Sequence, residues 1–151
     1  MAILKVRKAG DSVLKKICNS VDKIDKSIRK MLDDMAETMY HENGVGLAAP
    51  QIGENLRVVV IDVGDGLIEL INPIIIEKKG NKVDTEGCLS VPEIFGEVER
   101  YDKVVVESLN RRGKLQRIEA GGLLSTALQH EIDHLDGILF IDRAKSISRS
   151  K

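Results

Sequence analysis

Hydrophobic residues recur at three- and four-residue spacing between positions 25 and 44. This spacing follows the 3.6-residue period of a helix and places the apolar side chains on one stripe. Asp25 or Ser27 is suited to the N-cap, because either side chain can accept a free backbone N–H. Gly44 stands where a left-handed residue would end the helix. The pattern therefore predicts an amphipathic helix whose stripe is made of Ile28, Met31, Leu32, Met35 and Met39.

Runs of β-branched and apolar residues replace that period in the middle of the chain. They predict strands at 57–62, 67–72, 74–77, 103–109 and 115–120, with turns at 64–66 and 110–113. A second helix is predicted over 123–136, after a pair of glycines and before Gly137. A helix, a run of antiparallel strands and a second helix make an α+β fold. With no repeat or linker in the sequence, we expect residues 1–151 to form a single catalytic domain.

Composition excludes several classes of function. The 23 basic and 24 acidic residues give a net charge of −1, which argues against a nucleic-acid coat and against DNA as a partner. Aromatic residues make up only 3% of the chain, too few for base-stacking platforms. No apolar run approaches the roughly 18 residues of a membrane span, and no secretory signal is recognisable. Two cysteines suit a reducing compartment, so we expect a cytoplasmic protein without a membrane partner.

The strongest chemical signal is an HExxH motif inside the second predicted helix. His130 and His134 lie one turn apart, so both imidazoles face the same way and can bind one metal ion. Glu131 is rotated from His130 by about 100°, beside the metal rather than on it. A carboxylate there can deprotonate water and pass the proton to a leaving group. The alternative interpretation is a pair of helix-surface histidines next to an acid.

A third metal ligand has to come from upstream of the motif. The metzincin spacing would place it at Phe140, and no glutamate follows His134. The candidates are Cys88, His41 and, less favourably, Cys18. Cys88 lies in TEGCLSVP, which we interpret as a turn between strands. A thiolate with two imidazoles would leave a fourth position open for water, as in catalytic sites.

The segment GVGLAAPQIG follows the first predicted helix. Its small residues would let a substrate backbone approach closely, and Gln51 offers an amide donor for a developing oxyanion. Neither GxGxxG nor GxxxxGK is present, so the sequence does not support nucleotide binding. The alternative is a helix C-cap followed by a buried strand of small residues.

GVGLAAPQIG, EGCLS and QHEIDH, in this order, resemble the three signature motifs of peptide deformylases. These are metal-dependent amidases that remove the N-formyl group from nascent polypeptides. The resemblance covers nearly the whole chain and implies that Cys88, His130 and His134 are the metal ligands. It also implies that Glu131 is the general acid and base. The oxyanion hole would be formed by Gln51 and the backbone N–H of Leu89.

The resemblance further implies an N-formylmethionyl peptide as substrate, bound in extended form along Val45 and Gly46. It implies one divalent ion per chain, Fe²⁺ in vivo, with Zn²⁺, Ni²⁺ or Co²⁺ as alternatives. Three residues share the helix stripe of His130 and are expected to hold the methionine side chain: Leu123, Thr126 and Ala127. Ile94 and Phe95 would close the other wall. We also expect an ion pair in the region from Glu86 to Arg100.

Two other functions remain as alternatives. One is an HExxH metallo-endopeptidase, which the missing downstream ligand disfavours. The other is a catalytically idle metal- or peptide-binding module on the same fold. The tail after Asp142 is short and carries four basic residues and no acid. For this tail we expect at most a weak contact with the ribosome.

Overall fold

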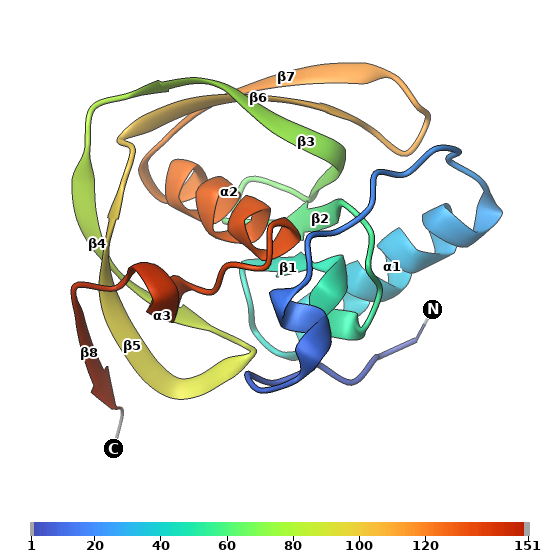
Figure 1. The fold of residues 1–151 in the computed structure, drawn as a ribbon. Coiled ribbons are helices and arrows are strands. Elements are labelled where there is room, and N and C mark those ends of the chain that lie inside the picture. The colour runs from blue at the N-terminus through green and yellow to red at the C-terminus, as the bar shows by residue number, and fades with distance from the viewer. Residues whose placement is uncertain (1, 150–151) are drawn as a thin grey trace.

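The structure is a computed structural model that describes residues 2–149. Its fold is α+β, as predicted, and Figure 1 shows helix α2 at the centre with the strands of two antiparallel sheets passing around it. The larger sheet has the order β1-β2-β3-β6-β7 and the smaller has the order β4-β5-β8. No helix among the described residues is long and apolar enough to cross a membrane.

The strands of the larger sheet are β1 (Gly46–Ala48), β2 (Val58–Ile61), β3 (Ile68–Lys79), β6 (Lys103–Leu109) and β7 (Leu115–Gly121). Those of the smaller sheet are β4 (Lys82–Cys88), β5 (Val91–Arg100) and β8 (Ser146–Arg149). The α-helices are α1 (Lys26–His41), α2 (Gly122–Leu135) and α3 (Phe140–Arg143). Two 3₁₀ helices, η1 (Ser12–Lys15) and η2 (Ala49–Ile52), complete the list.

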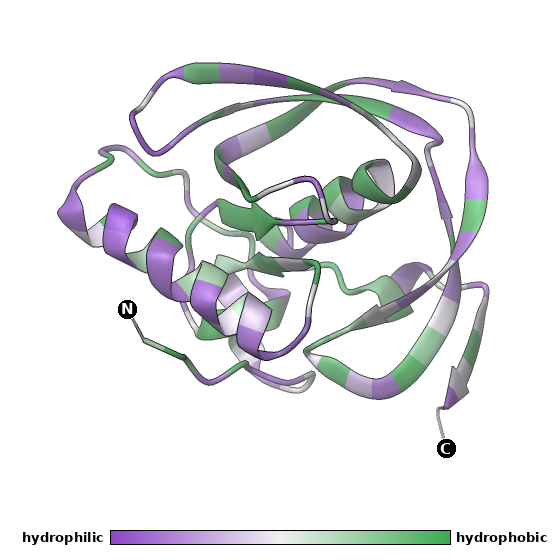
Figure 2. Ribbon diagram, turned by 180° about the vertical axis from the view of Figure 1, so that it is seen from behind, coloured by the Kyte–Doolittle hydropathy of each residue, from purple (hydrophilic) through white to green (hydrophobic). Residues whose placement is uncertain are grey.

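Helix α1 forms where the apolar stripe predicts it. Asp25 is the N-cap, and its carboxylate accepts a hydrogen bond from the backbone N–H of Ile28. Hydrophilic and hydrophobic bands alternate along α1 in Figure 2, as expected of a helix with one buried face. The prediction that Gly44 is the left-handed residue is wrong. Asn43 takes that conformation, with φ of 57°, because asparagine also tolerates it at a helix end.

The strand predictions are confirmed for β2, β6 and β7 and corrected in two places. The stretches 67–72 and 74–77 belong to one long strand, β3, whose register shifts between Ile71 and Ile74. Asn72, at φ of 54°, bends the strand, and its side-chain amide bonds both backbone groups of Val21. The turn expected within 85–92 is present but shorter than predicted. Cys88 is the last residue of β4, and only residues 89–90 separate β4 from β5.

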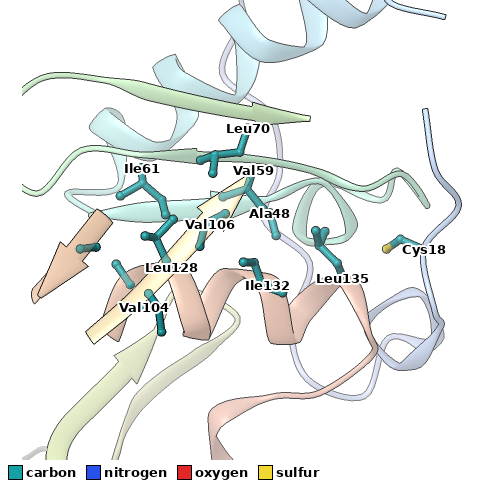
Figure 3. Close-up of a cluster of buried hydrophobic side chains, with 12 residues drawn as sticks. Cys18, Ala48, Val59, Ile61, Leu70, Val104, Val106, Leu128, Ile132 and Leu135 are labelled. Atoms are coloured by element: carbon teal, nitrogen blue, oxygen red, sulfur yellow. The ribbon is translucent and has the colours of Figure 1, made fainter. Parts of the chain in front are cut away.

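One face of α2 packs into the main core. Figure 3 shows Leu128, Ile132 and Leu135 pointing from α2 toward the strands. They meet apolar side chains that share a buried cluster and include Ala48, Val59, Ile61, Leu70, Val104 and Val106. Burying each large aliphatic side chain is worth roughly 1.5–3 kcal/mol. This packing fixes the rotation of the helix about its axis and so decides where its two histidines point.

Gly137, just past α2, provides a test of how tightly this helix end is packed. Its φ is +75°, and a Cβ would lie 2.5 Å from the carbonyl oxygen of Lys15. Gly64 also has a positive φ, +113°, but a Cβ there meets nothing within 4 Å. Both alanine substitutions introduce backbone strain of about 1–2 kcal/mol. We expect Gly137→Ala to lower the free energy of unfolding by a further ~1–3 kcal/mol in urea titrations. Equal losses for the two variants would contradict this packing.

Candidate active site

Cys88, His130 and His134 come together although 42 residues separate the thiol from the nearer histidine. Their ligand atoms lie within 4.8 Å of one another, and the Sγ of Cys88 is 3.4 Å from the Nε2 of His134. His41 is exposed at the end of α1, and Cys18 is buried in the main core. Burial raises the pKa of the Cys18 thiol to about 11. Of the three upstream candidates, only Cys88 joins the two histidines.

The donor set fits a divalent cation. One sulfur and two imidazole nitrogens are ligands of intermediate softness, suited to Zn²⁺ and the later first-row ions. Burial, together with the charges of His130 and Arg100, lowers the pKa of His134 well below its usual value, so this imidazole is in the neutral, ligating form. Two buried atoms beside the cluster, Glu131 Oε1 and His134 Nδ1, have no hydrogen-bond partner within residues 2–149. Water on such an ion would meet the unpaired Glu131 oxygen, whereas His134 turns its other nitrogen, Nε2, toward Cys88.

The side chains of β4 meet α2 in matched steps, which we call the β4–α2 ladder. Every second residue of β4 points to α2. Each step of two residues along β4 moves the contact by four residues along α2. The four contacts, with their distances, are Lys82 Nζ to Gly122 O, 2.8 Å; Asp84 Oδ2 to Thr126 Oγ1, 2.7 Å; Glu86 Oε1 to His130 Nδ1, 2.9 Å; and Cys88 Sγ to His134 Nε2, 3.4 Å. The candidate metal ligands Cys88 and His134 thus form the last step of a longer polar seam.

Glu86 orients one of the histidines. Its carboxylate contacts His130 Nδ1, so the Nε2 of that ring is the nitrogen left for a metal. The guanidinium of Arg100 donates two hydrogen bonds to Glu86, at 2.7 and 2.8 Å, and a third to Asp133. Burial opposes ionisation of Glu86, but Arg100 and His130 outweigh it and lower its pKa to about 2. The ion pair expected between positions 86 and 100 is confirmed.

Glu131 is 4% exposed and lies against the backbone of Gly46. A Cβ at Gly46 would come within 2.6 Å of the Glu131 Oε2, so only glycine leaves room for this carboxylate. Burial raises the pKa of Glu131 to about 7. A carboxyl group with such a pKa can both accept and release a proton near neutral pH.

Gln51 is fixed by hydrogen bonds at both ends of its amide. Its Oε1 accepts a hydrogen bond from the N–H of Ala48, and its Nε2 lies 3.1 Å from Ser90 Oγ and 3.6 Å from Cys88 Sγ. The donor group therefore points at the cluster of ligands. Leu89, between Cys88 and Ser90, lies in the turn that links β4 to β5.

Residues 7–9 support Gln51 and the turn that contains Leu89. The sequence did not indicate that this N-terminal segment belongs to the site. The N–H of Arg7 donates to the carbonyl of Gln51, and the N–H of Ala9 donates to the carbonyl of Ser90. The ammonium of Lys8 contacts the carbonyl oxygen of Leu89. These are mostly backbone contacts between distant segments, so no side-chain pattern could have signalled them.

A cavity of about 790 Å³ opens beside the cluster. Cys88, His130, Glu131, Gln51 and Leu89 all border it. The residues expected to contact substrate border it too, namely Val45, Gly46, Leu123, Thr126, Ala127 and Phe95. Ile94 is instead packed in a separate apolar cluster with Leu139 and Phe140. Polar residues that the sequence did not suggest also line the cavity, among them Asn43, Lys82 and Asp84.

Comparison with known proteins agrees with this arrangement. The family model described as polypeptide deformylase matches residues 3–150. The chain belongs to the peptide deformylase family. Deformylases are hydrolases that remove the N-formyl group from nascent peptides, and their metal dependence is consistent with the Cys/His cluster seen here.

Individual deformylases are similar over nearly the full length. The peptide deformylase of Acetivibrio thermocellus is 60% identical over 143 residues, which are 95% of this chain and 84% of the relative. That of Desulfitobacterium hafniense is 58% identical over 149 residues, 99% of both chains. The crystal structure of the Thermotoga maritima deformylase has a TM-score of 0.93 at 46% identity, covering 95% of this chain and 99% of that one. The Synechococcus elongatus deformylase, solved in complex with actinonin, has a TM-score of 0.92 at 42% identity, covering 95% and 79%.

Arg100 and Arg143 both pair with Asp133 and provide a matched test of the buried network. The Arg100 side chain is 3% exposed, whereas that of Arg143 is 46% exposed. Removing Arg100 leaves the Glu86 charge buried without its cation, so we expect Arg100→Leu to lower the free energy of unfolding by about 3–5 kcal/mol. Arg143→Leu should cost less than about 1 kcal/mol, as exposed pairs do. Denaturant titration of both variants measures the difference, and a similar loss in each would contradict the role given to burial.

Proposed function

We propose that this chain removes the formyl group from N-terminal formylmethionine, releasing formate and a free amino terminus. The observation that carries the proposal is the convergence of Cys88, His130 and His134 beside a buried, partly unpaired Glu131, with Cys88, His130 and Glu131 bordering one cavity. The endopeptidase alternative is not favoured, because the third ligand lies upstream of the motif and the family is that of deformylases.

The roles of the surrounding residues follow from their positions. A divalent ion on the three ligands would polarise the formyl carbonyl and acidify a water molecule. Glu131 would take a proton from a water molecule as the oxygen of that water attacks the formyl carbon. Gln51 Nε2 and the Leu89 N–H donate hydrogen bonds to the carbonyl oxygen as it gains negative charge. The C–N bond then breaks, and Glu131 delivers the proton to the departing amine.

The ion proposed for the cell is Fe²⁺, with Zn²⁺, Ni²⁺ or Co²⁺ as substitutes in the isolated protein. Affinity alone favours the later metals over iron. Zinc settles readily into closed four-coordination, whereas Fe²⁺ more easily accepts an additional oxygen ligand. Iron beside the Cys88 thiolate would also be sensitive to oxygen, which attacks the metal and the sulfur. Elemental analysis of protein purified without oxygen identifies the ion.

The substrate is proposed to lie in the cavity, its backbone along Val45 and Gly46 and its methionine side chain against Leu123, Thr126 and Ala127. All five residues border the same cavity as Cys88 and His130, which supports this placement.

Because nascent chains are its substrate, we also propose that the protein acts in the cytoplasm. A contact between the basic tail and the ribosome is less well supported, because two of its basic side chains already pair with acids of this chain. Arg143 pairs with Asp133 and Lys145 with Glu99, and residues 150–151 lie outside the described part of the chain.

Substitution of Glu131 tests the reaction. The metal-loaded protein should release formate from formyl-Met-Ala-Ser and leave acetyl-Met-Ala-Ser intact. Glu131→Ala should reduce kcat by about 10²–10⁴-fold, the usual contribution of general acid–base catalysis, while the metal content stays unchanged. Formate release and atomic absorption measure the two quantities. Equal cleavage of internal peptide bonds in both peptides would favour the endopeptidase, and undiminished turnover would remove Glu131 from the mechanism.

The two cysteines form a matched pair for testing the ligand set. Cys88→Ser should reduce metal content and activity together, because a hydroxyl is a much poorer anionic ligand at neutral pH. Cys18→Ser should keep both, since this thiol lies in the apolar core. Metal content per chain after dialysis is the measurement. Loss of metal in Cys18→Ser but not in Cys88→Ser would overturn the proposed ligand set.

A further inference from the structure

The outer steps of the β4–α2 ladder place charged groups on the wall of the cavity. Asp84 Oδ2 accepts a hydrogen bond from Thr126 Oγ1 at 2.7 Å and lies 3.1 Å from Lys82 Nζ. Lys82 Nζ also donates to the carbonyl oxygen of Gly122, at 2.8 Å. Lys82, Asp84, Gly122 and Thr126 all border the cavity. One side of a space expected to hold an apolar side chain is therefore strongly polar.

Within residues 2–149, one N–H of the Lys82 ammonium has no partner. An ammonium group has three N–H bonds, and the contacts to Gly122 and Asp84 use two of them. Its side chain is 20% exposed, so the group is partly withdrawn from solvent while it borders the cavity. Hydrogen bonds from Thr126 and Lys82 hold the pKa of Asp84 below its usual value, so the carboxylate is ionised and neutralises the lysine.

The ladder also places this donor relative to the proposed reaction centre. Thr126 lies one step of four residues before His130 on α2, which is about 6 Å along the helix axis, and Gly122 lies one step further. A peptide side chain that runs from a formyl group held between Glu131 and Gln51 along this wall would pass Thr126 and end near Lys82. This placement rests on the proposed function.

We propose that this wall adapts the pocket to a first residue whose unbranched side chain carries a hydrogen-bond acceptor near its end. Methionine sulfoxide, the oxidised form of the natural first residue, is that kind of side chain. Its sulfoxide oxygen accepts a hydrogen bond from the third N–H of Lys82, so this oxygen has a partner when the side chain enters the pocket. A wholly apolar wall would leave the same oxygen buried and unpaired.

The test compares three peptides on the metal-loaded full chain: formyl-Met-Ala-Ser, its methionine sulfoxide analogue and formyl-norleucine-Ala-Ser. Norleucine has an unbranched side chain without an acceptor and serves as the reference. For the wild type we expect kcat/KM on the sulfoxide peptide to lie within about tenfold of that on the norleucine peptide. A larger deficit would overturn the proposal by itself, whatever the variants show.

Variants at position 82 identify the donor. Lys82→Met should lower the ratio of sulfoxide to norleucine kcat/KM by about 5–150-fold, equivalent to the roughly 1–3 kcal/mol cost of an unpaired buried polar group. Lys82→Gln retains an N–H donor and should recover most of the ratio. Lys114→Met removes an exposed lysine from the turn after β6 and should leave the ratio unchanged. If the ratio is unchanged in Lys82→Met, another group accepts the sulfoxide, and the role proposed for Lys82 is refuted.

A binding measurement separates recognition from turnover. In the Glu131→Ala background, calorimetry should show that Lys82→Met weakens binding of the sulfoxide peptide more than that of the norleucine peptide. The two proposals also fail in different ways. Absence of formate release from formyl-Met-Ala-Ser would refute the proposed function. Normal release from that peptide with loss of activity on the sulfoxide alone would refute only this inference.

Discussion

Strand β4 and helix α2 advance at nearly the same rate along their common direction. Two strand residues span about 6.6 Å and four helix residues about 6.0 Å, so steps of two keep pace with steps of four over the whole ladder. The four-residue spacing of the histidines is thereby matched to the two-residue spacing of Glu86 and Cys88. A shift of β4 by one residue would turn both side chains to the opposite face of the sheet. The site depends on this register.

Buried charged side chains hold β4 in this register against α2. They orient the histidine ligand more than they stabilise the fold. Glu86 and Arg100 are both about 5% exposed, and the desolvation of such a pair offsets much of its attraction. The pair nevertheless fixes the ring of His130 and ties β5 to α2 through Asp133. The apolar face of α2 supplies the stabilising burial on the opposite side. The helix is thus held by hydrophobic packing on one side and oriented by hydrogen bonds on the other.

Features encoded within a short stretch could be predicted from the sequence, and those encoded between distant stretches could not. The period of α1, the hairpin of β6 and β7, and the HExxH spacing are local patterns. Asn72-Pro73 resembles a strand break, yet the chain continues through it as β3 because the asparagine side chain bonds Val21. Strand β4 was not predicted, because Lys82, Asp84 and Glu86 interrupt any apolar run in this stretch. Its partner helix 40 residues away was not predictable, nor was the support that Arg7 and Ala9 give to Gln51 and Ser90.

Strand β8 adds a different property, resistance to association through sheet edges. It pairs with β5 over Ile94–Glu97 and so covers part of a ten-residue strand whose free backbone groups would otherwise face outward. On this side the sheet ends in β8, which has only four residues, follows Lys145 and ends at Arg149, while β4 forms the opposite edge. Short edges with basic side chains are poor templates for pairing with another chain. Strand β8 thus disfavours pairing of the β5 side of this sheet with the sheet of a neighbouring molecule.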